Sequence, residues 1–196
     1  MVKAITSSLG KAKTKSVWSI AHVKSIALIG KENMEKKLFE ELYSIDVNKK
    51  VEKKNGLSYL SWAWAWAEFV KRCPDAKYEI KTFDGKPYLF DEKLGYMVFT
   101  SITVGNDTKE MWLPVMDNAN KSMKDHPYKY LVRRWNDQKR SYETYEKTCE
   151  PASMFDINKT IMRCLVKNIS MFGLGLYIYA GEDLPEQKES NEIDNQ

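Results

Sequence analysis

The chain is poor in the residues that build zinc centres and histidine-based active sites. It contains three cysteines and two histidines in 196 residues. An odd number of cysteines without zinc or redox spacing argues against a disulfide framework and favours a reducing compartment. His126 has no nucleophile motif near it, so the sequence gives little support for a histidine-based catalytic triad. We therefore expect no metal and no cofactor.

Long apolar runs and phosphate-binding loops are also missing. No stretch approaches the roughly 18 apolar residues of a membrane-spanning helix. No Gly-x-x-x-x-Gly-Lys-Ser/Thr motif is present, which excludes the usual nucleotide hydrolysis site. The glycines at 173 and 175 follow a predicted helix, not a strand, so they do not form a dinucleotide fingerprint. Asp75 with Glu79 and Lys81 resembles a metal-dependent nuclease signature, although its spacing is short for convergence on a metal.

The charges that are present are unevenly distributed. Apolar residues make up 43% and charged residues 30%, which is enough for a packed core. Residues 1–33 carry six lysines and one acid, whereas residues 182–196 carry six acids and one lysine. We expect three parts: a leader at 1–33, disordered or untranslated with Met34 as the start, a domain at 34–181, and a disordered acidic tail at 182–196.

The N-terminal part of the domain predicts two helices. Apolar residues at helical spacing follow Met34, and residues 49–55 form a charged linker. Residues 57–72 predict a helix because alanine alternates with tryptophan there, with Ser58 or Ser61 as N-cap. We expect Trp62, with residues 66, 69 and 70, on its core face. Trp64 lies nearer the polar side and is the candidate for a partner subunit or ligand.

A β region follows these helices. Residues 76–83, 86–91, 96–104 and 108–116 predict strands that form an antiparallel meander, because their connections are short. Residues 117–125 predict a short helix or loop. Residues 128–135 and 141–148 flank a basic tip and predict an inserted β-hairpin.

The clearest predicted helix spans residues 155–172. Asp156 or Asn158 is the expected cap, and the following glycines end the helix. Its expected apolar stripe consists of Ile161, Leu165, Ile169 and Phe172. Residues 176–180 predict a short strand or extended segment. The fold class is therefore α+β, with an antiparallel meander packed on a long C-terminal helix, a tryptophan-rich N-terminal helix and an inserted hairpin.

Two clusters of cations are candidate functional sites. Lys159, Arg163 and Lys167 recur every four residues, so they share one face of the last helix and suit successive phosphates. A plain solvated face is the alternative. The hairpin interleaves cations with aromatic rings that could stack unpaired bases, or could simply pair across a solvated hairpin. Its candidate DNA-binding residues are Lys129, Arg133, Arg134, Trp135, Lys139 and Arg140.

Four sequence segments resemble the Sak-type phage single-strand annealing proteins. They are NGLSYLSWAWAW at 55–66, MWLPVMD at 111–117, DIN and IMRCLVKN within 156–168, and MFGLGLYIYAGEDLP at 171–185. The resemblance covers residues 34–186 and leaves out the leader. It extends to the Erf and Rad-fifty-two annealing proteins.

The resemblance implies a β-β-β-α core, assembly into rings or filaments, and single-stranded DNA in a basic groove. Phe172-Gly173 matches the Phe-Gly pair of the eukaryotic relative, and Lys167 falls on one of its basic positions. Ser170 and Val166 stand where that relative has further cations. Arg163, one turn earlier, is the candidate substitute for them.

These observations lead to one functional hypothesis and two alternatives. We expect a non-enzymatic phage recombination protein of the host cytoplasm that anneals complementary strands without ATP. Its expected partners are single-stranded DNA, further copies of itself and a phage or host single-strand-binding protein, with no membrane. The alternatives are a DNA- or RNA-binding module without annealing activity, and a metal-dependent nuclease.

Overall fold

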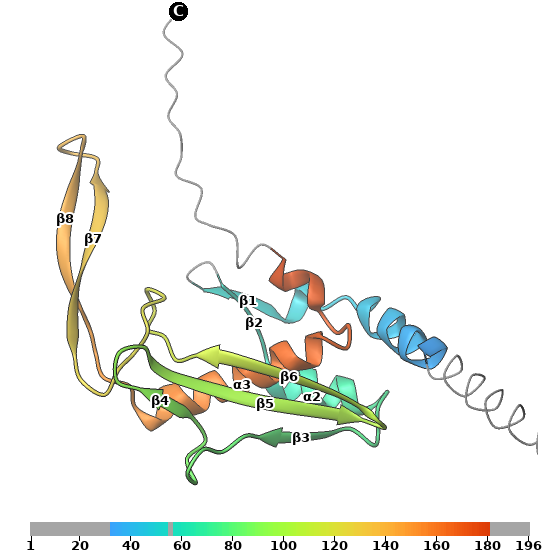
Figure 1. Cartoon of the computed structure of the whole chain (residues 1–196). Helices are drawn as coiled ribbons and strands as arrows, with labels where there is room; N and C mark the ends of the chain where they lie inside the picture. Colours follow the sequence, from blue (N-terminus) through green and yellow to red (C-terminus); the bar gives the residue numbers. More distant parts are fainter. Residues whose placement is uncertain (1–31, 55–56, 181–196) are drawn as a thin grey trace, which may run out of the picture.

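The computed structural model describes residues 32–54 and 57–180 (Figure 1). It is an α+β structure with antiparallel sheets, which confirms the predicted class. The predicted tail and nearly all of the predicted leader lie outside the described residues. Within those residues, no helix is long and apolar enough to cross a membrane.

The largest sheet has a ten-residue strand at its centre. This strand, β5 (Gly95–Val104), pairs along one edge with β6 (Asp107–Pro114). Along its other edge lie both β3 (Lys77–Ile80) and β4 (Leu89–Asp91), at opposite ends of β5. The two short strands therefore pair with β5 and not with each other.

This arrangement corrects the simple meander expected from the sequence. The turn at 84–85 closes only one isolated bridge, between Phe83 and Lys86. Phe83 packs on Phe99 of β5 with ring centroids 5.2 Å apart, and the Lys81 amide donates to the Phe99 carbonyl. The segment between β3 and β4 therefore packs along β5. Strand β5 is long enough for β3 and β4 to pair with different parts of the same edge.

Helix α3 (Met154–Ser170) covers one face of this sheet (Figure 1). Ser153 caps it, not Asp156 or Asn158 as predicted. Asp156 instead accepts from the Ser153 backbone amide, which completes a capping box. All four residues of the predicted apolar stripe are buried: Ile161, Leu165, Ile169 and Phe172.

A buried amide fixes α3 against the sheet. The Asn168 side chain is fully buried and donates to the carbonyls of Thr100 on β5 and Lys109 on β6, each at 3.1 Å. The Thr100 hydroxyl and the Cys164 thiol lie 3.4 Å apart on the same side. Because side chains alternate along a strand, Trp112 of β6 faces away from α3 and is 57% exposed.

The N-terminal part differs from the sequence prediction at residues 51–60. Residues 32–43 are helical as expected, with Leu42 fully buried, and η1 (Asn48–Lys50) follows. The supposed linker and the start of the supposed helix then form two paired strands, β1 (Val51–Lys54) and β2 (Leu57–Leu60). Helix α2 (Trp62–Val70) begins only after Ser61, which makes no side-chain cap.

The buried face of α2 is narrower than predicted. Ala65 and Phe69 are buried, and Trp66 packs on Phe69. Trp62 was expected in the core, but it is 45% exposed because it stands at the first residue of the helix. Trp64 is half-buried and packs against the core that Phe69 shares with α3.

The predicted hairpin is present and projects from the body of the molecule (Figure 1). It consists of β7 (Tyr128–Asn136) and β8 (Ser141–Cys149), paired from Tyr128–Cys149 to Asn136–Ser141. We call it the arm. The loop at 117–125 before it carries only an isolated bridge, between Met116 and Ser122.

The chain after α3 turns sharply, so the predicted strand at 176–180 is wrong. Gly173 and Gly175 adopt positive φ angles of 121° and 63°. A Cβ on Gly173 would lie 2.6 Å from the Phe39 carbonyl oxygen, so this close approach requires glycine. The turn leads directly into the 3-10 helix η2 (Leu176–Tyr179). The chain at these residues is therefore helical and not extended.

Candidate nucleic-acid interface

The three cations predicted on one face of α3 each lie over an aromatic ring. Lys159 Nζ is 5.9 Å from the centre of the Phe155 ring. The Arg163 guanidinium is 4.6 Å from the Tyr59 ring, and Lys167 Nζ is 5.0 Å from the Tyr179 ring. The structure therefore brings these cations together and combines them with rings, which is the mixture that single strands require.

The tyrosines under Arg163 and Lys167 come from two elements other than α3. Tyr59 lies on β2, between the buried residues Ser58 and Leu60, so strand alternation turns it outward. Tyr179 ends η2. The Ser58 hydroxyl donates to the Ile178 carbonyl at 2.9 Å and ties these two segments together. Both tyrosines are absent from the site residues predicted from the sequence.

Lys159 is the most constrained of the three cations. Its ammonium group lies 3.0 Å from Asp156 Oδ1, the carboxylate of the capping box. Burial acts to raise the pKa of Asp156, but hydrogen bonds from Ser153 and Lys159 outweigh it and hold that pKa below its ordinary value. This carboxylate stays ionised and competes with phosphate for the Lys159 ammonium group.

The loop before the arm borders the same face of α3. Lys159 and Arg163 line a shallow hollow of about 80 Å³ together with Tyr59 and the loop residues Asn118 and Asn120. In the loop, Asp117 Oδ1 accepts the backbone amides of residues 119 and 121 at 2.8 and 2.9 Å. The loop is thereby held in place beside the cations.

Two further lysines of this loop repeat the pairing of cation and ring. Lys121 lies 5.4 Å from the Tyr130 ring, and Lys124 lies 5.3 Å from the Tyr128 ring. Both tyrosines are at the base of β7. Neither lysine was predicted as a site residue, because the loop offers no periodicity from which to choose it.

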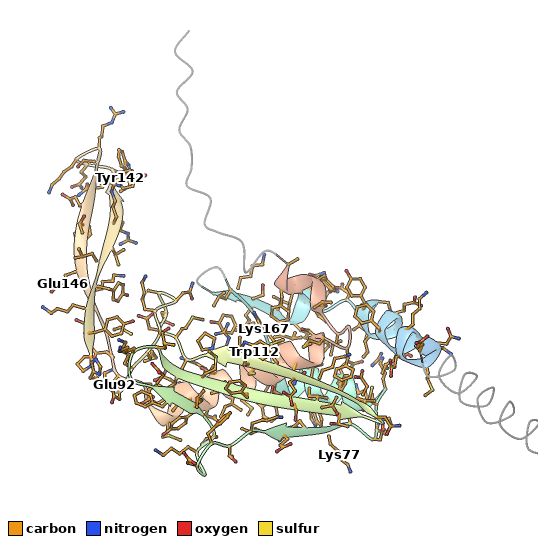
Figure 2. All side chains as sticks on the ribbon, viewed as in Figure 1. Lys77, Glu92, Trp112, Tyr142, Glu146 and Lys167 are labelled. Carbon is orange, nitrogen blue, oxygen red and sulfur yellow. The ribbon has the colours of Figure 1, made fainter. Side chains whose placement is uncertain are left out.

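The outer part of the arm presents a small aromatic and cationic surface. Trp135 and Tyr142 face each other across the strands, with ring centroids 5.0 Å apart. The Arg133 guanidinium lies 4.5 Å from the Tyr142 ring. Figure 2 shows Tyr142 near the tip of the arm, well away from Lys167 on the body.

Two of the other predicted cations of the arm form ion pairs with glutamates. Lys129 pairs with Glu146 at 2.6 Å, and Lys139 pairs with Glu143 at 2.5 Å. Hydrogen bonds from Lys139, and then from Tyr145 and Asn136, lower the pKa of Glu143 to about 2. Both lysines thus have carboxylates beside them.

All six cations of the arm are exposed, and three of them are arginines. These are Arg133, Arg134 and Arg140. Arg140 lies in the turn with a φ of 45°. Arg134 stands opposite Glu143 in the strand register.

The described residues do not assemble a metal site. No group of three or more His, Cys, Asp or Glu side chains in the described ranges could hold an ion. The Asp75 carboxylate accepts the Gly105 backbone amide at 2.9 Å, and Glu79 is exposed on β3. Asp75 and Glu79 of the nuclease signature therefore do not meet at one site in the part of the chain that the structure describes.

The family model described as Sak Single Strand Annealing Protein matches residues 37–196. No curated protein and no solved structure matches the chain.

Proposed function

Because the chain belongs to the Sak single strand annealing protein family, we propose that it binds single-stranded DNA and anneals complementary strands in phage recombination. One observation carries the proposal. The cations on one face of α3 are each paired with an aromatic ring, and this face borders a loop that leads into a basic, aromatic arm.

In this proposal, α3 holds the backbone of the first strand. Lys159, Arg163 and Lys167 neutralise phosphates and release condensed counterions, which favours binding at low salt. Annealing also requires that most bases remain free to test pairing. A helix face that grips phosphates leaves those bases exposed toward a second strand.

The arm has the complementary task of guiding the second strand. Its cations reduce the repulsion between two phosphate backbones, and Trp135 supplies a ring on which an unpaired base can stack. The proposed guiding residues are Lys129, Arg133, Arg134, Lys139 and Arg140.

Assembly into a ring or filament extends this surface. Neighbouring copies would make the cationic face continuous and raise the effective concentration of matched segments. We place Trp64 at the contact between subunits. The process needs no ATP, since the sequence has no phosphate-binding loop. We assign no catalytic step, and the site of action is the cytoplasm of the host bacterium.

The direct test is annealing of two fluorescently labelled complementary oligonucleotides without ATP. We expect the purified protein to accelerate their pairing. Binding of single strands with an unchanged annealing rate would leave only a DNA- or RNA-binding module. Magnesium-dependent degradation that is lost in Asp75→Ala would instead support the nuclease. Negative-stain microscopy with and without DNA tests for rings or filaments.

A further inference from the structure

The hollow between α3, β2 and the loop at 116–120 has the composition of a nucleobase site. Tyr59 supplies an aromatic face, and Asn118 and Asn120 supply amide donors and acceptors. Arg163 and Lys159 line the same hollow and bring cations within reach of a backbone, and Asp117, whose Oδ1 accepts two loop amides, lines it as well. Rings, amides and cations are the three chemical features that proteins use to hold an unpaired base and its phosphate.

Arg163 occupies the central position in this arrangement. Its guanidinium lies over the Tyr59 ring at 4.6 Å and also lines a second, narrower hollow beside Lys167 and Tyr179. A long, charged side chain between two hollows can turn to a phosphate and leave the ring face to a base. A base that stacks on this ring replaces the half-buried guanidinium there, and the guanidinium gains the phosphate as its new partner.

We propose that this hollow takes one unpaired nucleobase of the strand held on α3. The base stacks on Tyr59, the amide of Asn118 contacts its edge, and Arg163 moves to the adjoining phosphate. This inference rests on the proposed binding of single-stranded DNA. It adds that one base per subunit is turned inward while the others stay available for pairing.

A consequence is selectivity for single strands that carry bases. A base within a duplex must be unpaired and unstacked before it can enter such a site, and this costs free energy. An abasic strand offers the same phosphates but nothing to stack on Tyr59. Sugar–phosphate contacts alone would not distinguish the two single strands.

The test compares a short oligothymidylate with an abasic strand of equal length by fluorescence anisotropy. We expect the protein to bind the oligothymidylate about tenfold more tightly. Tyr59→Leu should remove most of this difference by weakening binding of the oligothymidylate, with no change in the salt dependence of binding. Tyr59→Phe keeps the ring and should restore the difference.

Trp112→Leu is the matched control, because it removes an exposed aromatic ring on the face of the sheet away from α3 (Figure 2). It should leave both affinities as they are. If Tyr59→Leu does not fold, Asn118→Ala on the exposed loop replaces it, with a loss of about threefold limited to the oligothymidylate.

Two outcomes overturn the inference in distinguishable ways. Equal affinity of the unaltered protein for the two strands, or an equal loss on both in Tyr59→Leu, refutes the base site and leaves DNA binding intact. Failure to bind either strand refutes the proposed function together with the base site.

Discussion

Replacing Arg163 and Lys167 with glutamine tests whether α3 holds the DNA backbone. The double variant keeps Lys159 and both tyrosines, and it removes the two cations that lie over Tyr59 and Tyr179. Glutamine is an unbranched polar residue with a helix propensity similar to those of arginine and lysine, so the fold should survive. The measurement is the affinity for a single strand as a function of salt.

The expected magnitude follows from the number of phosphate contacts. Each contact with a single strand contributes about 0.7 to the slope of log affinity against log salt. Three cations on α3 would then weaken binding about 18-fold between about 50 and 200 mM salt. One remaining cation would weaken it only about threefold over the same range.

A control separates this local effect from net charge. Lys77→Gln with Lys86→Gln removes the same two charges from exposed positions on β3 and on the turn after it. This variant should keep the original salt slope. If the α3 variant keeps that slope too, or if the control loses as much, the backbone is held elsewhere and our reasoning about α3 is wrong.

Three other predictions concern the arm, the turn after α3 and the cysteines. The pKa of Glu143 is lowered to about 2, so its contribution to stability is complete above the ordinary value near 4.5 and is lost as the pH falls toward 2. A carboxyl titration by NMR with a midpoint near 4.5 would contradict this. Gly173→Ala should destabilise the fold by about 1–3 kcal/mol in urea unfolding, because its Cβ would collide with the Phe39 carbonyl. Gly85→Ala also places alanine at a positive φ, 75°, but has no neighbour within 4 Å, so an equal loss there would show that the collision is not needed to explain the effect. All three cysteines are buried, and burial raises their pKa, so a thiol reagent should modify none in the folded protein and all three after unfolding.

Local sequence patterns were sufficient to predict an element where one kind of signal, such as apolar spacing, dominated. The apolar spacing through Ile161 and Leu165 predicts α3, because only one face of that helix can be buried against the sheet. The same spacing places Arg163 and Lys167 on a common face. Strands β5 and β6 follow from β-branched and aromatic residues on either side of a glycine turn.

The errors occur where signals compete. The run of alanine and tryptophan after Ser61 favoured a helix so strongly that the prediction extended it back over residues 57–60. The dipeptide Asn55-Gly56 is typical of a two-residue hairpin turn and would have predicted β1 and β2. With that hairpin, Tyr59 alternates with buried Ser58 and Leu60, and its half-buried ring faces outward toward Arg163.

Two of the three pairings of cation and ring on α3 could not be predicted from local spacing, whereas Lys159 and Phe155 are four residues apart on one helix. Arg163 meets Tyr59, and Lys167 meets Tyr179, only because β2 and η2 pack beside α3. That packing depends on the tight turn through Gly173 and on the bond from the Ser58 hydroxyl. Such contacts depend on tertiary structure, which no local periodicity describes.

The outer part of the arm is more exposed to solvent than the body of the molecule. Beyond Val132 and Tyr145, most of its side chains are exposed, and its amides are protected mainly by pairing between the two strands. A two-stranded hairpin is only marginally stable by itself. These amides should therefore exchange with deuterium through local opening, much faster than those of α3. A strand that binds there must also order the arm, so part of the binding free energy is spent on closing it, and DNA should slow this exchange.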